Sequence, residues 1–173
     1  MVERVQNEVI AAKLDAQAAL HWQGFYYVRY QQHLHRLKAE VYRADQQPKL
    51  AEQQIILREQ DQVQLPSGQF KIQTATFGLS AALFGQRLYL RTRKGGEKIH
   101  LHGRIGHWPL KKAIQEAQIF PWTRHTIQIL STDNVMLGVF TPKGFWLAQS
   151  AYCEAGGWLP ISVSSTLEFN DEH

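Results

Sequence analysis

The chain has 173 residues, of which 44% are hydrophobic and 20% charged, the composition of a globular protein with one ordinary domain or two small ones. No apolar run approaches the roughly 20 residues of a membrane-spanning helix, and residues 1–20 lack the order of a secretory signal. We therefore expect a cytoplasmic protein with no membrane partner. Cys153 is the only cysteine, which excludes an intramolecular disulfide and a cysteine-rich zinc site.

Positive charge is concentrated in one segment of the chain. The net charge of the whole is +4, and residues 87–124 contain nine Lys or Arg against two Glu. The rest of the chain has ten basic and thirteen acidic residues. A localised basic region is typical of an anion-binding face. The alternative is an ordinary solvated surface, and charge alone favours that alternative.

The first 84 residues predict one helix followed by short strands. Apolar residues spaced along one helical face predict a helix over residues 5–20, which we interpret as the tail of something larger. Residues 29–32 form a candidate hairpin turn without the usual Asn-Gly signal. Residues 43–52 are polar, contain Pro48 and read as a linker. Strands are predicted at residues 25–28, 33–37, 55–58, 62–65 and 70–76, the last two joined by a turn at Pro66-Ser67-Gly68.

The later part of the chain predicts one helix and several strands. Residues 88–92 alternate buried and outward positions, residues 94–97 form a turn, and residues 98–102 are extended. A helix is predicted to begin at Pro109 and to end at Pro121. Three further strands are predicted at residues 127–130, 135–140 and 145–148, and the polar tail from residue 164 is expected to fray.

These elements predict the α+β class: an N-terminal helix and a β-rich linker region, followed by a small C-terminal α+β domain with one main helix against a mostly antiparallel sheet. We expect the domain boundary near residues 77–85. The predicted segments are a helical tail of a preceding substrate-binding domain (1–20), a β-rich connecting region (21–84), a C-terminal domain (85–165) and a flexible tail (166–173).

The basic segment contains the residues that we expect to bind nucleic acid. Arg91 and Arg93 share one strand face about 7 Å apart, close to the phosphate repeat of a nucleic-acid strand. Lys111 and Lys112 begin the predicted helix, where the backbone N–H groups also favour phosphate. Gly95-Gly96 lets an anion approach the backbone. The candidate nucleic-acid-binding residues are Arg91, Arg93, Lys94, Lys98, Arg104, Lys111, Lys112 and Arg124.

Other residues give weaker evidence of a functional site. Trp122 could stack on a base, but packing beneath the helix is the favoured interpretation. The pairs His33/His35 and His100/His102 each share a strand face but have no evident third ligand, so no metal site is expected. No phosphate-binding loop, dinucleotide fingerprint or nucleophile elbow occurs, and Cys153 has no activating neighbour. We expect no catalytic residue and no bound cofactor in this chain.

These basic motifs resemble the C-terminal domain of tRNA(Ile)-lysidine synthetases. The resemblance is carried by Arg91-x-Arg93, Gly96-Glu97, Leu110-Lys111-Lys112 and Pro121-Trp122-x-Arg124, with the strands that follow. Trp108 and Pro109 stand where that family usually has basic residues. An upstream stretch, with Ala11–Ala16, Gly24-Phe25 and Val28–Gln31, is similar to the junction leading into that domain, so the resemblance covers about residues 8–150.

The resemblance implies a function for the chain. The family's enzymes are ATP-dependent carbon–nitrogen ligases that attach lysine to the wobble cytidine of tRNA(Ile), with a Ser-Gly-Gly-x-Asp-Ser loop that is missing here. The chain is thus expected to be the part that grips the tRNA body and acceptor stem, inactive alone, with ATP and Mg bound by an N-terminal domain.

The partners implied by the resemblance are tRNA(Ile) with a CAU anticodon and that N-terminal domain, and a homodimer is left open. Two other classes of protein fit the residues. One is a protein-interaction or oligomerisation module with a solvated basic face, which would use the aromatic run Phe25–Tyr27 as its contact. The other is a freestanding RNA-binding regulator with no preference for this tRNA. Salt-sensitive binding to RNA distinguishes the first from the second, and competition between tRNAs tests the preference.

Overall fold

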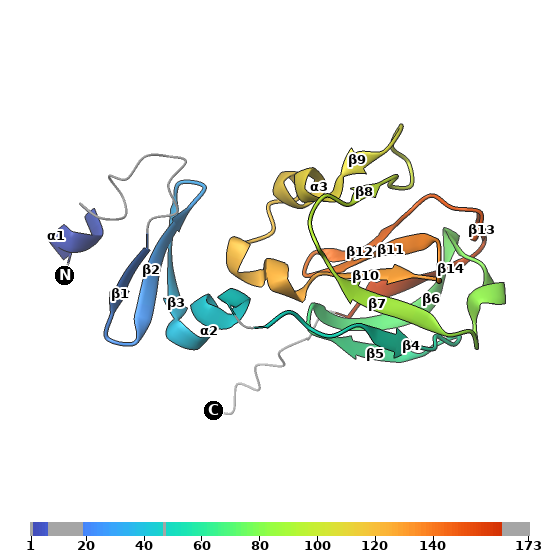
Figure 1. The fold of residues 1–173 in the computed structure, drawn as a ribbon, viewed down its shortest axis with the longest axis horizontal. Helices are drawn as coiled ribbons and strands as arrows, with labels where there is room; N and C mark the ends of the chain where they lie inside the picture. The colour runs from blue at the N-terminus through green and yellow to red at the C-terminus, as the bar shows by residue number, and fades with distance from the viewer. Residues whose placement is uncertain (1, 7–18, 47, 164–173) are drawn as a thin grey trace, which may run out of the picture. The chain divides into compact units, whose positions relative to one another are not determined.

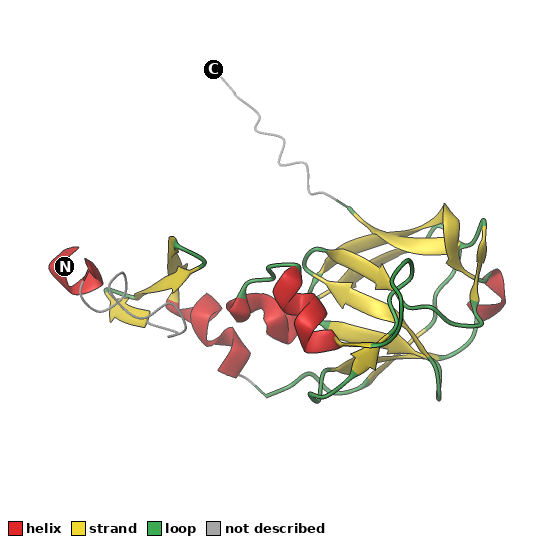
Figure 2. Ribbon diagram, turned by 90° about the horizontal axis from the view of Figure 1, so that it is seen from above, coloured by secondary structure: helices red, strands yellow, loops and turns green. Residues whose placement is uncertain are grey.

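A computed structural model describes residues 2–6, 19–46 and 48–163 (Figure 1). The chain divides into two compact units. The first contains residues 1–48 and 120–125, and the second contains residues 49–119 and 126–173. Mixed helices and antiparallel sheets confirm the predicted α+β class, and in the described part of the chain strands predominate over helices (Figure 2).

The first unit is built on a three-stranded antiparallel sheet. Its strands are β1 (Ala19–Trp22), β2 (Phe25–Tyr30) and β3 (His33–Lys38), in the order β1-β2-β3. Both hairpins turn on two residues with positive φ, at Gln23-Gly24 and at Gln31-Gln32. Two glutamines therefore adopt the left-handed conformation that Asn-Gly usually supplies, so the second hairpin is present without its usual sequence signal.

The helices of the first unit are short. They are α1 (Val2–Val5), α2 (Ala39–Arg43) and the 3₁₀ turn η2 (Ala44–Gln46), and most of the 3₁₀ segment η4 (Pro121–Thr126) also belongs to this unit. The predicted helix over residues 5–20 lies largely outside the described residues, and its end is wrong. Ala19 and Leu20 belong to β1, where they pair with Val28 and Tyr27, because strand pairing overrides the helical spacing of the apolar residues.

The second unit contains two antiparallel sheets. One has five strands in the order β12-β11-β10-β7-β4, and the other is formed by β13, β6 and β14, with β5 also paired to β6. The first sheet comprises β4 (Gln53–Ile55), β7 (Leu88–Thr92), β10 (Gln128–Ser131), β11 (Met136–Thr141) and β12 (Gly144–Leu147). The second comprises β5 (Gln62–Leu65), β6 (Gly68–Leu79), β13 (Cys153–Ala155) and β14 (Trp158–Ser162).

A hydrophobic core joins these two sheets. It includes Leu65, Phe70 and Ile72 from the second sheet and Leu90 and Phe140 from the first. On its other face, the five-stranded sheet contributes Ile129 and Val139 to another core, which is covered by α3 (Leu110–Glu116). Figure 1 shows α3 and the β8–β9 ribbon above β10, β11 and β12 of this sheet. Both faces of β10 and β11 are therefore buried, which explains the nearly continuous apolar sequence of β11.

Residues 49–84 belong to the second compact unit. β6 runs without a break through part of the boundary expected at residues 77–85, and it pairs with β13 and β14 near the end of the described chain. Neither β13 nor β14 was predicted. Their pairing places residues 49–84 in the same unit as the basic segment. The proposed domain limits at residues 20, 84 and 165 stay a prediction.

The helix over the basic segment is shorter than predicted. It begins at Leu110, directly after Pro109, but its regular part ends at Glu116. Gln118 then adopts a positive φ of 56°, and the backbone N–H of Ile119 donates to the carbonyl of Ile114. This left-handed residue ends the helix before Pro121, which instead begins η4. The polar tail expected to fray lies outside the described residues.

Candidate nucleic-acid interface

A short two-stranded ribbon brings together lysines that are separated in the sequence. β8 (Lys98–Ile99) pairs with β9 (Trp108–Pro109), with Lys98 opposite Pro109. The backbone N–H of Leu110 also donates to the carbonyl of Glu97, at 2.8 Å. This pairing places the start of α3 beside the turn that precedes β8. We call the exposed residues gathered there the lysine corner: Lys94, Lys98, Lys111 and Lys112.

The charges of the lysine corner are available to a ligand. All four side chains are exposed, and among the described residues none of them forms an ion pair. The ammonium of Lys112 lies 4.7 Å from the centre of the Trp108 ring, a cation–π contact that leaves its positive charge in place. Trp108 is held by a hydrogen bond from its indole N–H to the carbonyl of Ile105, at 3.0 Å. Thus Trp108, which departs from the resembled family, supports a lysine.

The predicted anion site at the glycine turn is already filled by the protein. The carboxylate of Glu97 accepts hydrogen bonds from the backbone N–H groups of Lys94 and Gly95, the latter at 3.1 Å. Burial pushes the pKa of Glu97 upward, but these N–H donors and the charge of Arg93 outweigh it and hold that pKa below its ordinary value. The turn therefore shapes the lysine corner and offers these two N–H groups to no external phosphate.

The stability of the chain is expected to depend on this carboxylate. Because its folded pKa is depressed, its contribution is present above the unfolded value of about 4.5 and is lost as the pH falls through the lower folded pKa. We expect Glu97→Gln to lower the unfolding midpoint in urea at pH 7 but to match the wild type at low pH. The exposed Glu154→Gln variant is the control. A Glu97→Gln deficit that persists unchanged to pH 3 would contradict this expectation.

The start of α3 adds little positive charge of its own. The helix has seven residues, and its first N–H is occupied by the carbonyl of Glu97. A short helix has a small dipole, so the predicted backbone site for phosphate at this position is not formed as expected. The side chains of Lys111 and Lys112 carry the charge instead.

The arginines of the basic segment are more strongly engaged than the lysines. Arg91 forms an ion pair with Glu52 at 2.8 Å, and its guanidinium lies over the Tyr89 ring. Arg104 forms an ion pair with Glu116 at 3.0 Å. Arg93 follows β7, and its carbonyl accepts a hydrogen bond from the ammonium of Lys49. The alternation of β7 is confirmed, since Leu88 and Leu90 are buried and Arg91 is half-exposed.

Arg124 belongs to the first unit, in η4, whereas the other candidate residues belong to the second. The same segment contains Trp122, whose side chain is only 6% exposed, so its burial is confirmed, whereas its packing beneath the helix stays a prediction. Trp122 stacks on Phe120 with their ring centres 4.8 Å apart, and the ring of His35 lies 5.0 Å away. Burial lowers the pKa of His35, and the nearby His33 lowers it further.

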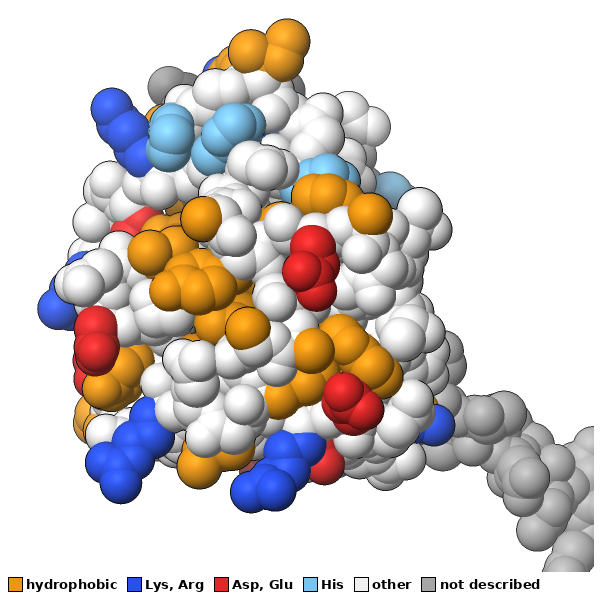
Figure 3. All heavy atoms as spheres, turned by 90° about the vertical axis from the view of Figure 1, so that its right-hand side faces the viewer, with side chains coloured by type: hydrophobic (Ala, Val, Ile, Leu, Met, Phe, Trp, Pro, Cys, Tyr) orange, Lys and Arg blue, Asp and Glu red, His pale blue; other side chains and the backbone are white. Residues whose placement is uncertain are grey.

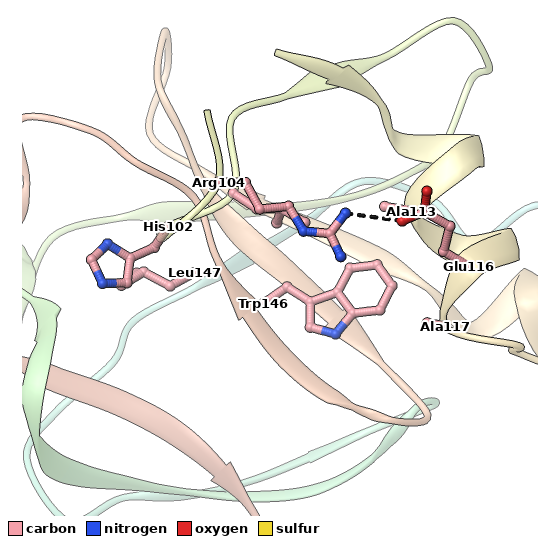
Figure 4. Close-up of a pocket in the computed structure, with 8 residues that line it drawn as sticks. His102, Arg104, Ala113, Glu116, Ala117, Trp146 and Leu147 are labelled. Carbon is pink, nitrogen blue, oxygen red and sulfur yellow. Dashed lines mark hydrogen bonds and ion pairs between the residues drawn. The ribbon is translucent and has the colours of Figure 1, made fainter. Parts of the chain in front are cut away.

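The second unit also contains a cavity that the sequence did not reveal. Its volume is about 410 Å³, and it lies between the loop after β8, the second half of α3, and β12 (Figure 4). Figure 4 shows Arg104 and Trp146 side by side, with Glu116 opposite. No local motif identifies Trp146, because strand pairing brings β12 to this place. The lining residues are Leu101, His102, Arg104, Ala113, Glu116, Ala117, Trp146 and Leu147.

The remaining candidates have structural contacts. His102 stacks on Phe77, with ring centres 4.3 Å apart, and a ring nitrogen of His100 is hydrogen-bonded to the carbonyl of Arg104. Among the residues that the structure describes, no three His, Cys, Asp or Glu side chains gather as metal ligands. Cys153 is half-buried, and its thiol donates to the carbonyl of Ala148.

The face of the chain in Figure 3 shows no continuous basic surface. Hydrophobic side chains occupy its centre, separated by Asp and Glu, and Lys and Arg lie mostly at its edges. In the part of the chain that the structure describes, no helix has the length and apolar character needed to cross a membrane.

Comparisons with known proteins agree with these motifs. Residues 88–159 match the family model described as the TilS substrate C-terminal domain. The tRNA(Ile)-lysidine synthase of Acinetobacter baylyi is 64% identical over 164 residues, which are 95% of this chain and 36% of that protein. The synthase of Legionella pneumophila strain Paris is 36% identical over 131 residues, which are 76% of this chain and 29% of that protein. The chain thus spans about a third of the length of the curated relatives it matches.

A solved structure, described as the crystal structure of the TILS C-terminal domain, matches with a TM-score of 0.46 and 19% identity, covering 66% of this chain and all of that one. The family assignment comes instead from the domain match and from the identity to the synthases. On these two findings, the chain belongs to the tRNA(Ile)-lysidine synthase family and contains its C-terminal domain.

Proposed function

We propose that this chain is the tRNA-binding C-terminal part of a tRNA(Ile)-lysidine synthase, and that the lysine corner contacts the phosphate backbone of the tRNA. The observation that supports this proposal is the gathering of Lys94, Lys98, Lys111 and Lys112 by the β8–β9 pairing, with their side chains exposed. In the whole enzyme, a separate domain would use ATP and Mg to ligate lysine to the wobble cytidine of a CAU-anticodon tRNA(Ile). The chain described here would supply no catalytic residue.

Paired RNA makes phosphate the natural target of these lysines. The major groove of an A-form helix is deep and narrow, so proteins contact such helices largely through phosphates and 2′-hydroxyls. Lysine ammonium groups position a nucleic acid in this way without reading its sequence. We infer that the lysine corner holds the body or acceptor stem of the tRNA and so orients the anticodon loop toward the catalytic domain. Such a protein would work in the cytoplasm, and a homodimer is compatible with this role.

The test removes two charges from the lysine corner. We expect the Lys111→Ala/Lys112→Ala variant to bind tRNA(Ile) more weakly and with a smaller dependence on salt. Each lost phosphate contact reduces the slope of log affinity against log salt by about 0.7–0.9, because fewer counterions are released on binding. The measurement is equilibrium binding across a salt series, with a methionine tRNA as competitor.

A matched variant controls for net charge. Lys71→Ala/Lys143→Ala removes the same charge outside the lysine corner, from β6 and from the turn before β12, and is expected to leave most of the salt slope intact. If the Lys111→Ala/Lys112→Ala variant keeps the wild-type slope, the lysine corner is a solvated surface and contacts no RNA. If the wild-type chain binds no RNA even at low salt, the proposed function itself fails.

A further inference from the structure

The cavity beneath Arg104 has an aromatic wall and a polar rim. Trp146, half-buried in β12, forms one wall, with the small residues Ala113 on α3 and Ala117 directly after it. Arg104 and Glu116 are joined by their ion pair at the rim (Figure 4). A volume of about 410 Å³ lies within the range of about 300–1,000 Å³ that small-molecule sites occupy. The cavity can therefore hold a compact ligand.

The chemistry of the lining selects the kind of ligand. The charges of Arg104 and Glu116 offset each other, so the cavity has little preference for an anion. The flat indole of Trp146 favours a planar ring, which it can stack upon. The guanidinium offers hydrogen-bond donors and the carboxylate offers acceptors, a pairing that suits the edge of a neutral heterocycle. A nucleobase combines these features, because it has a π-face for stacking and donors and acceptors along its edge.

The position of the cavity connects it with the lysine corner. Lys112 and Glu116 are four residues apart on α3 and are therefore neighbours on one helix face. Arg104 belongs to the loop between β8 and β9, the two strands that form the lysine corner. An RNA strand whose phosphates contact Lys111 and Lys112 thus passes within reach of the cavity.

We infer that this cavity receives one unpaired nucleobase of the bound RNA, stacked on Trp146 with its edge toward Arg104 and Glu116. This inference rests on the proposed function, because it takes the chain to bind RNA. The lysine corner contacts phosphates only. The cavity would add a contact to a base that lies in an unpaired segment or at a strand end. Base stacking on an aromatic side chain tolerates any base, so Trp146 contributes affinity while the polar rim contributes selectivity.

The first experiment compares two substitutions of Trp146. Trp146→Leu removes the π-face, and Trp146→Phe keeps an aromatic ring in its place. With an RNA that has an unpaired single-stranded end, we expect Trp146→Leu to lose about 5- to 150-fold in affinity, the range of one base–aromatic stack. Trp146→Phe is expected to retain most of that affinity. With a blunt, fully paired RNA duplex, all three proteins are expected to bind alike.

The outcomes distinguish a failure of this inference from a failure of the proposed function. If Lys111→Ala/Lys112→Ala flattens the salt slope but Trp146→Leu binds both RNAs like the wild type, the cavity inference fails and the tRNA-binding proposal stands. If the wild type binds neither RNA, the proposed function fails first.

A second measurement covers the case in which a substitution disturbs folding, since Trp146 packs against the core beneath α3. The wild-type chain is labelled with fluorotryptophan, and the Trp146 resonance is assigned from its absence in Trp146→Phe. A short unpaired RNA is expected to shift that resonance, whereas a blunt duplex is not. An unmoved Trp146 resonance at saturating unpaired RNA would overturn the inference.

Discussion

Replacing Phe140 with alanine is expected to lower the free energy of unfolding of the second unit by about 3–5 kcal/mol. Phe140 lies in β11 and is 0% exposed. Its ring meets that of Phe70 edge-on, with ring centres 4.9 Å apart, and Phe70 belongs to the other sheet. The truncation therefore removes apolar burial from both sheets at once and leaves a cavity that the surrounding rigid strands cannot fill by collapse.

Urea unfolding measures this loss. The control is Ile56→Ala, at a position that is 45% exposed in the same unit, where we expect a change within about 0.5 kcal/mol. The slope of the unfolding free energy against urea is expected to stay the same, because the same surface is exposed on unfolding. A loss below about 1 kcal/mol for Phe140→Ala would mean that the two sheets do not share one core.

The second large effect is expected from Gly78→Ala in β6. A methyl group at Gly78 would lie 2.6 Å from the carbonyl oxygen of Trp158 and 2.7 Å from its backbone nitrogen. The approach is mutual, because a methyl group at Gly157 would lie 2.5 Å from the backbone of Gly78. These are backbone atoms, which cannot rotate away as a side chain can. The strands must therefore separate, and we expect a loss of about 1–3 kcal/mol or more.

Amide hydrogen exchange shows which strands the substitution destabilises. In Gly78→Ala, the amides of β13 and β14 are expected to exchange faster than in the wild type, because both strands pair with β6. Thr76→Ala, at an exposed position of the same strand, is the control and is expected to leave these amides protected. Unchanged protection in Gly78→Ala would show that the close approach of Gly78 to Trp158 does not hold in solution.

Several elements of this protein could be predicted because their signals are local. The alternation from Leu88 to Thr92 placed the leucines inside and Arg91 outside, as the structure has them. The turn at Pro66–Gly68 joined the two strands expected on either side. The helix expected to begin at Pro109 starts one residue later, at Leu110. Periodicity and turn chemistry act over a few residues, so a sequence is sufficient to show them. The motifs between Arg91 and Arg124 also indicated the family.

The sequence by itself thus determined the α+β class, the basic segment and the family, whereas the tertiary structure decided how the segment is used. Only the pairing of β8 with β9 brings Lys98 beside Lys111 and Lys112. Only the fold of the turn shows that Glu97 occupies the backbone N–H of Gly95, one of the groups expected to bind phosphate. The cavity at Trp146 and the pairing of β6 with β14 likewise join distant parts of the chain. Such contacts depend on strand register and packing between segments far apart in sequence, which local residue patterns do not encode.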